Sequence, residues 1–136
     1  MRKVADLPLS SGTARDARDI RGLLDLGIEA VVDLAMDEPP VHPTRELVYL
    51  RFPLVDGQGN PAWVLRLAVD AVAGLLTAGM PTLVACSAGA SRSPVIAAMA
   101  MAKHAGIRPE EALTRIGHGD VSPALWREVV TSGGRQ

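Results

Sequence analysis

The sequence predicts a single α/β domain, residues 1–136, in which a central, mostly parallel sheet is flanked by helices. Short apolar runs that resemble buried strands alternate with longer stretches whose apolar residues recur at helical spacing. One run, Pro81–Ala85, carries no charge, which is typical of a strand covered on both faces. The 136 residues, 48% of them hydrophobic, suffice for one core, and no repeat or linker divides the chain.

The N-terminal third is expected to hold two strands and one helix. A short edge strand is predicted over Lys3–Leu7. Thr13 is suited to cap a helix that has Asp16 in its first turn and extends to Gly27, a residue type that often ends helices. The apolar run Ile28–Leu34 predicts a mostly buried strand.

The middle of the chain predicts a loop, a strand, a second loop and a helix. Asp37–Pro43 contains three prolines and must be a loop, whereas Leu47–Phe52 has the pattern of a buried strand. Residues 53–60 form a turn-rich loop. The pair Asn60-Pro61 then favours a helix start, with Asn60 as its cap, and an apolar stripe at helical spacing follows.

Three more helices are predicted after the uncharged strand. The first begins at Ser93-Pro94 and is apolar on all sides through Ala102, so it is expected to be buried. Two others are predicted to begin at Pro109 and at Ser122-Pro123. Because strands and helices alternate, the sheet should be covered on both faces.

Charge and cysteine content exclude several classes of function. A formal net charge of -1 argues against general binding of nucleic acid or of acidic membranes. With one cysteine, no internal disulfide can form. Residues 1–10 lack the apolar stretch of a signal peptide, and Val95–Ala102 is too short to span a bilayer. We expect a cytoplasmic protein.

The segment Cys86-Ser87-Ala88-Gly89-Ala90-Ser91-Arg92-Ser93 joins the uncharged strand to the buried helix. Such a loop directs backbone N–H groups toward one concave site at the positive end of the helix dipole, and this site binds an oxyanion. Small residues at 87–91 allow close approach, and Arg92 can hold two anion oxygens. The same dipoles favour the thiolate form of Cys86, which would lie beneath the anion as a nucleophile.

This Cys-x5-Arg-Ser segment resembles the signature of the protein tyrosine and dual-specificity phosphatases. Leu50–Asp56, which ends 30 residues before the cysteine, is similar to the loop that carries the general acid in that family. Ile28–Leu34 resembles the preceding strand, and Val121-Ser122-Pro123 resembles the start of the last helix. The resemblance covers nearly the whole chain and implies a phosphatase-like fold.

The resemblance also implies roles for individual residues. Cys86 attacks phosphorus to form a phosphocysteine, and Asp56 protonates the leaving oxygen and then activates water. Arg92 binds phosphate together with the backbone N–H groups of Ser87, Ala88, Gly89, Ala90 and Ser91. Ser93 matches the hydroxyl that binds the cysteine sulfur. Neither a metal nor another cofactor is required, and the substrate is a phosphorylated protein or a small phosphomonoester.

One position departs from the pattern, because Ala85 stands where most members have a histidine that helps to order the loop. The departure keeps open one alternative, a phosphate-binding module that has lost catalysis. A second alternative is a sulfurtransferase, because rhodanese-like domains also place a cysteine in an anion-binding loop. The general-acid position of Asp56 favours the phosphatase over both. Oligomeric state and the physiological substrate are not predicted.

Several residues also have structural interpretations. A lone cysteine is often a small core residue, Asp56 before Gly57 suits a turn, and Ser93 could cap the helix. The hydroxyls of the loop serines need have no role. Trp63 is expected to pack rather than to line a substrate site. The histidines, His42, His104 and His118, lack metal-ligand spacing and are expected to be solvated or satisfied.

Overall fold

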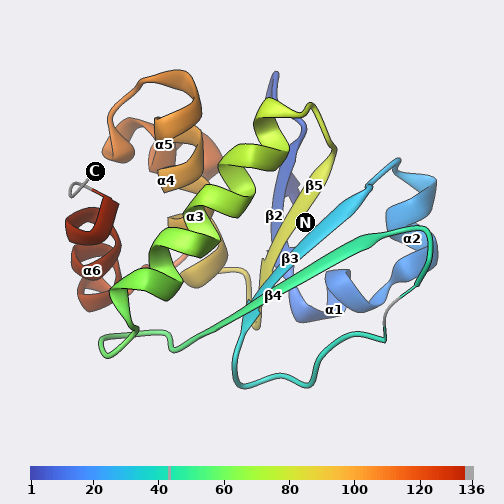
Figure 1. The fold of residues 1–136 in the computed structure, drawn as a ribbon, viewed down its shortest axis with the longest axis horizontal. Helices are drawn as coiled ribbons and strands as arrows, with labels where there is room; N and C mark the ends of the chain where they lie inside the picture. Colours follow the sequence, from blue (N-terminus) through green and yellow to red (C-terminus); the bar gives the residue numbers. More distant parts are fainter. Residues whose placement is uncertain (43, 134–136) are drawn as a thin grey trace.

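The structure, a computed structural model, describes residues 1–42 and 44–133, so Pro43 of the predicted first loop lies outside the described part. The elements, in chain order, are β1 (Arg2–Lys3), β2 (Leu9–Thr13), α1 (Ala14–Arg18), α2 (Ile20–Asp25), β3 (Ala30–Ala35), β4 (Val48–Leu54), α3 (Ala62–Thr77), β5 (Thr82–Cys86), α4 (Arg92–Ala105), α5 (Pro109–Ile116) and α6 (Pro123–Gly133). The sheet order is β1-β2-β5-β3-β4, and only the β1–β2 pair is antiparallel among the paired strands. The predicted α/β class with a mostly parallel sheet is confirmed (Figure 1).

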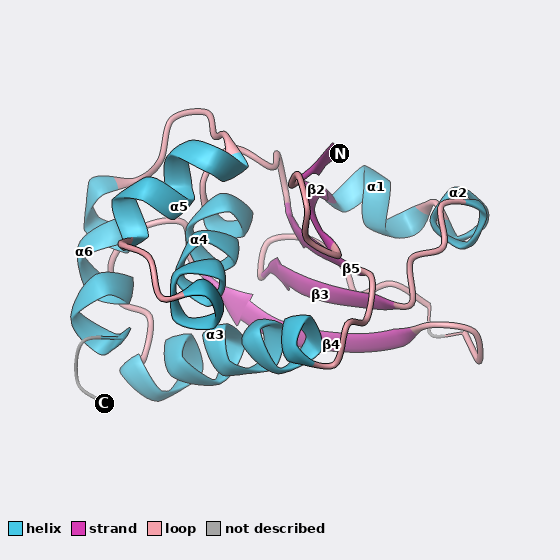
Figure 2. Cartoon of the chain, turned by 90° about the horizontal axis from the view of Figure 1, so that it is seen from above, coloured by secondary structure: helices cyan, strands magenta, loops and turns pink. Residues whose placement is uncertain are grey.

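Helices cover both faces of the sheet. The views from the front and from above place α1 and α2 on one face and α3 to α6 on the other (Figures 1 and 2). Alternate residues of the central strands divide between two apolar clusters, as the two-residue repeat of a strand requires. Leu83 and Ala85 pack toward α1 and α2, whereas Val84 and Cys86 belong to the larger cluster with α3 to α6.

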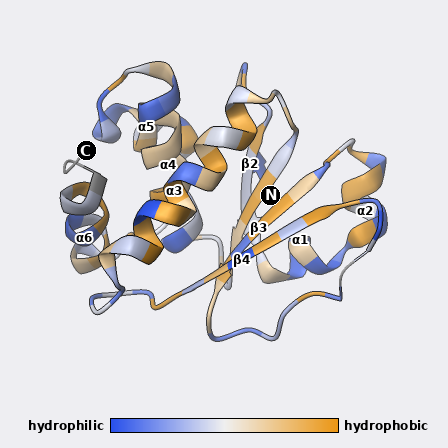
Figure 3. Cartoon of the chain, viewed as in Figure 1, coloured by the Kyte–Doolittle hydropathy of each residue, from blue (hydrophilic) through white to orange (hydrophobic). Residues whose placement is uncertain are grey.

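The central helix of the larger cluster is α4, whose residues 92–102 are all buried. This confirms the burial predicted from its apolar composition on all sides. By contrast, α3 buries one stripe, which includes Leu65 and Val72, and it shows both hydrophilic and hydrophobic colours in Figure 3. Among the described residues, no helix has both the length and the apolar character needed to cross a bilayer.

The sequence prediction missed β2, which lies between β1 and β5 in the sheet. The predicted strand over Lys3–Leu7 is wrong as well, because β1 covers Arg2–Lys3 alone. The segment Leu9–Thr13 contains Ser10, Ser11 and Gly12, which suggest a turn rather than a strand. Pairing with two neighbouring strands supplies the stabilisation that local propensity does not.

The predicted helix from Thr13 to Gly27 is divided in two. Thr13 caps α1 as expected: its side chain accepts a hydrogen bond from the Asp16 N–H, and the Asp16 carboxylate accepts one from the Thr13 N–H. Asp19 then ends α1 and caps α2, because its carboxylate accepts the Gly22 N–H at 3.1 Å. A second capping residue thus interrupts a continuous apolar pattern.

The predicted start of α3 is also wrong in detail. The helix begins at Ala62 after Pro61, and no side chain of the described residues caps it. Asn60, which was expected to be the cap, turns its amide back toward Val55. Trp63 has 61% of its surface exposed, so its predicted packing role is wrong.

Candidate active site

The candidate site lies where β5 ends and α4 begins, in a loop that we call the cradle and define as residues 86–92. Gly89 has a φ of 71°, a left-handed conformation that glycine adopts without strain. A Cβ there would lie 3.1 Å from the Gly12 carbonyl oxygen, so Gly89 also allows the cradle to pass close to β2. In the described part of the chain no side chain caps α4, which leaves its first N–H groups available to an anion.

Other segments hold the cradle in place. Three of their backbone N–H groups donate to it: Ala14 to the Ser87 carbonyl (3.2 Å), Gly119 to the Ala90 carbonyl (3.1 Å) and Ser122 to Ser91 Oγ (2.9 Å). The Ser87 hydroxyl in turn donates to Glu38 Oε2 at 2.8 Å. The serine hydroxyls, for which the sequence indicated no role, therefore anchor the loop.

Cys86 ends β5 and is buried, with 2% of its surface exposed. Its Sγ lies 3.4 Å from Ser93 Oγ. The Ser93 hydroxyl also lies 3.0 Å from Ser11 Oγ and 3.3 Å from the Gly12 carbonyl oxygen. Because Ser91 rather than Ser93 occupies the N-cap position of α4, the helix-cap interpretation of Ser93 is wrong. The structure thus places Ser93 against the sulfur.

Arg92 is the first residue of α4, and its side chain is almost fully buried. Its Nη1 donates to Asp37 Oδ1 at 2.7 Å and to the Leu54 carbonyl at 2.9 Å. Its Nε is buried and has no hydrogen-bond partner among the described residues. A buried N–H without a partner is costly, so this nitrogen is suited to a ligand oxygen.

Burial alone would lower the pKa of Arg92, but the hydrogen bond and charge of Asp37, together with the charges of Cys86 and Asp56, raise it above its ordinary value. The guanidinium therefore stays charged in a buried setting. It also lies close enough to both predicted reactive groups for their charges to act on it.

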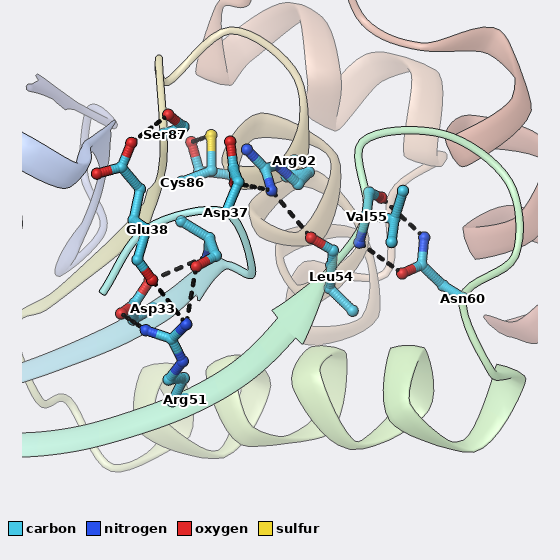
Figure 4. A network of polar contacts seen from close by, with 12 residues as sticks. Asp33, Asp37, Glu38, Arg51, Leu54, Val55, Asn60, Cys86, Ser87 and Arg92 are labelled. Carbon is cyan, nitrogen blue, oxygen red and sulfur yellow. Dashed lines mark hydrogen bonds and ion pairs between the residues drawn. The ribbon is translucent and has the colours of Figure 1, made fainter. Parts of the chain in front are cut away.

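Two carboxylates that the sequence analysis did not select lie beside the cradle. Asp37 and Glu38 lie just after β3, separated from it by Met36, and Figure 4 shows Asp37 directed toward Arg92 and Glu38 toward Ser87. The hydrogen bond from Arg92 holds the pKa of Asp37 below its ordinary range. Hydrogen bonds from Ser87 and Arg18 do the same for the pKa of Glu38. Both side chains are therefore anionic at neutral pH.

The segment with these carboxylates is fixed by a partly buried ion pair. Arg51 Nη1 donates to Asp33 Oδ2 at 3.1 Å, and Arg51 Nη2 donates to the carbonyl oxygens of Ala35 (3.1 Å) and Glu38 (2.8 Å). Figure 4 shows this network directly beneath the segment. Arg51 thus sets the position from which the two acids reach the cradle.

The predicted acid, Asp56, is exposed and lies two residues after Leu54, whose carbonyl binds Arg92. The segment that carries Asp56 therefore begins beside Arg92. The turn interpretation of Asp56 is compatible with this position, because residues 56–58 form a bend and the Gly57 N–H donates to the Val55 carbonyl at 3.0 Å. The structure thus brings Cys86, Ser93 and Arg92 together, with Asp56 on the adjoining segment.

Ala85 lies on the opposite face of β5 from Cys86. It is fully buried in the cluster formed with Leu83 and the residues of α1 and α2. The three histidines are exposed, as the sequence indicated. In the described part of the chain, no three histidine, cysteine or acidic side chains lie close enough together to hold a metal ion.

A signal for the missed carboxylates was present in the sequence. Asp37 and Glu38 are adjacent acids at the carboxyl end of a predicted parallel strand, which is where α/β proteins form their sites. The three prolines of the segment indicated only a loop. Ser11 had no comparable signal, because its strand was not predicted.

Comparisons with known proteins show where else this fold occurs. No protein-family profile matches the sequence, and no curated protein matches it. Among solved structures, human DUSP28 is 22% identical, with a TM-score of 0.85 over 98% of this chain and 96% of that one. A mouse putative dual specificity phosphatase complexed with zinc tungstate is 22% identical, with a TM-score of 0.84 over 97% and 85%.

A third similar structure is the human tyrosine phosphatase-like serine/threonine/tyrosine-interacting protein. It is 16% identical, with a TM-score of 0.83 over 98% of this chain and 95% of that one. The chain therefore has the fold of the dual-specificity phosphatases, as the segment from Cys86 to Ser93 predicted.

Proposed function

We propose that the chain is a phosphatase that hydrolyses phosphomonoesters through a phosphocysteine, with phosphoproteins as its substrates. The observation that carries the proposal is the Nε of Arg92, which is buried at the end of the loop that begins at Cys86 and has no hydrogen-bond partner among the residues that the structure describes. A buried cation with a free donor, an uncapped helix start and a cysteine on the same loop form a site for a reactive oxyanion. Structural likeness to dual-specificity phosphatases adds support.

In the first step, the Cys86 thiolate attacks phosphorus, and the bond from phosphorus to the leaving oxygen breaks. Asp56 gives its proton to that oxygen as the bond breaks. Arg92 and the N–H groups at the start of α4 stabilise the charge on the other phosphoryl oxygens. The product of this step is a phosphocysteine and a free alcohol or phenol.

In the second step, water attacks the phosphocysteine and passes a proton to Asp56. The sulfur–phosphorus bond breaks, and Cys86 leaves as a thiolate. In the resting site the Cys86 thiol donates to Ser93 Oγ at 3.4 Å and the Ser93 hydroxyl donates to the Gly12 carbonyl. When the sulfur leaves as a thiolate, rotation of the Ser93 hydroxyl lets it donate to the sulfur instead. The cycle ends with inorganic phosphate and with Asp56 protonated again, so no metal and no cofactor takes part.

The substrate class follows from the resemblance to the protein tyrosine and dual-specificity phosphatases. We propose phosphotyrosine, with phosphoserine and phosphothreonine as further substrates. The short connections around the cradle favour a shallow site that would accept both an aryl and an alkyl phosphate.

The second candidate is a phosphate-binding protein with little turnover. The observation that favours it is Ala85, which is fully buried in an apolar cluster and offers the cradle no side-chain hydrogen bond. The four contacts that anchor the cradle from other segments favour the enzyme, because they order the loop without a histidine.

The test is hydrolysis of p-nitrophenyl phosphate in the presence of a chelator, with Cys86→Ser as the inactive form and Glu111→Gln as a matched surface control. We expect hydrolysis that vanadate inhibits, its loss in Cys86→Ser, and no change in the control. Full activity of Cys86→Ser would refute the proposal. Binding of phosphate without turnover would favour the second candidate.

A further inference from the structure

The segment that carries Asp56 is closed on itself by the side chain of Asn60. The Val55 N–H donates to Asn60 Oδ1 at 2.8 Å, and Asn60 Nδ2 donates to the carbonyl oxygens of Val55 (2.9 Å) and Gly57 (3.2 Å). Figure 4 shows the two bonds between Val55 and Asn60, residues that lie on either side of Asp56 in the chain. Asn60 itself is buried. The segment therefore has one defined shape.

A second contact ties the end of this segment to α6. Both carboxylate oxygens of Glu128 accept backbone N–H groups, Oε2 from Gly59 at 2.8 Å and Oε1 from Asn60 at 3.3 Å. The neighbouring residues Leu125 and Val129 are buried in the main core, so α6 is a fixed support. Glu128 thus couples the segment to the packed body of the molecule.

The beginning of the segment is fixed as well, because the Leu54 carbonyl accepts a hydrogen bond from Arg92. Asp56 therefore lies between two anchoring side chains, Arg92 on one side and Glu128 of α6 on the other. A carboxyl group that must meet a leaving oxygen depends on such placement, since a displacement of about 1 Å can cost roughly 100-fold in rate. An exposed loop without the second anchor would sample many positions of its carboxyl group.

We propose that Glu128 is a positioning residue for the acid step, a role that rests on the phosphatase function proposed above. It does not touch the substrate and acts through the backbone of Gly59 and Asn60. Glu128→Ala removes both acceptors. Glu128→Gln keeps one oxygen but places an amide N–H₂ against a backbone N–H, so it disrupts half of the contact.

The experiment compares two esters in each preparation: p-nitrophenyl phosphate, whose leaving group needs little protonation, and phenyl phosphate, whose leaving group needs much more. We expect Glu128→Ala to lower kcat/KM for phenyl phosphate about 10-fold and for the nitrophenyl ester less than about threefold. Glu128→Gln should show a smaller effect of the same kind. Glu111→Gln, an acid on α5, is the control and should leave both rates unchanged.

The ratio of the two rates is independent of the folded fraction, so partial unfolding of a variant does not disguise the result. In an Asp56→Asn background, Glu128→Ala should cause no further loss on phenyl phosphate, because the acid it positions is gone. Equal losses on both esters, or an additive loss in the Asp56→Asn background, would overturn the role of Glu128 but leave the phosphatase proposal intact. Failure of the parent chain to hydrolyse either ester would overturn the phosphatase proposal and this inference with it.

Discussion

Asp37 and Arg92, 55 positions apart in the sequence, form an ion pair with 2.7 Å between Oδ1 and Nη1. The carboxylate is largely exposed, whereas the guanidinium is buried. Because Leu54 binds the same nitrogen, the orientation of the guanidinium is set before any ligand arrives. Because the Arg92 guanidinium is already oriented, less free energy is lost to ordering it when a ligand binds.

The first prediction concerns this pair. Asp37→Ala should lower kcat/KM for p-nitrophenyl phosphate about fivefold, the equivalent of roughly 1 kcal/mol, because an exposed partner contributes modestly. Asp37→Asn keeps an oxygen acceptor and should stay within about threefold of the parent. Asp70→Ala, which removes an exposed partner of Lys103, is the control. An Asp37→Ala rate equal to the parent's would show that Leu54 alone orients Arg92.

The second prediction concerns Asp56 as the acid. Asp56→Asn should slow phenyl phosphate by about 100-fold or more and p-nitrophenyl phosphate much less, because only the poorer leaving group needs a proton. Steady-state rates on the two esters measure this. Asp120→Asn changes another exposed acid, the residue after Gly119, and should leave the ratio unchanged. An equal loss on both esters would assign Asp56 to the turn alone.

The third prediction separates the two chemical steps. Ser93→Ala removes the hydroxyl that lies 3.4 Å from Sγ, so the phosphocysteine should break down about 10-fold more slowly while its formation changes little. Rapid mixing with p-nitrophenyl phosphate should then show a burst of phenolate close to one per protein chain. Thr114→Ala, on the exposed side of α5, serves as the control. A slower turnover without a burst would place Ser93 in the first step.

The fourth prediction uses the one tyrosine of the chain. Burial and the hydrogen bond from Tyr49 Oη to Asp33 raise the pKa of Tyr49 above its ordinary value of about 10. Ultraviolet absorbance of the phenolate should therefore titrate above pH 10 in the folded protein. Because the folded pKa is the higher one, the associated stability is complete below about pH 10 and is lost as pH rises further.

Denatured protein is the matched reference for this titration, and its midpoint should return to about 10. Asp33→Asn should move the folded midpoint downward, since it removes the charge that opposes ionisation. A folded midpoint at or below that of denatured protein would show that the Tyr49–Asp33 bond does not form in solution.

The sequence predicted the sheet class and the reactive segment because both depend on local patterns. The uncharged, mostly apolar residues 81–85 and an apolar helix from Ser93 onward are visible without any knowledge of pairing. The strand Leu9–Thr13 was not visible, because its small polar residues suit a turn and its stability comes from β1 and β5. Local patterns therefore predicted the position of the cradle but not β2, the strand that pairs with β5.

The supporting groups around the site could not be predicted for a related reason. Asn60 precedes a proline and a helix, so its sequence context favours a cap over the contact with Val55. Glu128 lies 68 positions from Asn60, and only the packing of α6 against α3 brings them together. Positioning residues depend on tertiary contacts, whereas the nucleophile and the clamp lie on one short segment.

The anchors of the cradle connect ligand affinity to conformational stability. Its contacts come from residues 14, 38, 119 and 122, so the anion site exists only while these distant parts of the chain are packed. An oxyanion that binds it should therefore favour the native state by mass action, by about 2.7 kcal/mol at a concentration 100 times its Kd. The midpoint of thermal denaturation then becomes a measure of ligand occupancy, and it can rank substrates on a chain whose Cys86 has been replaced.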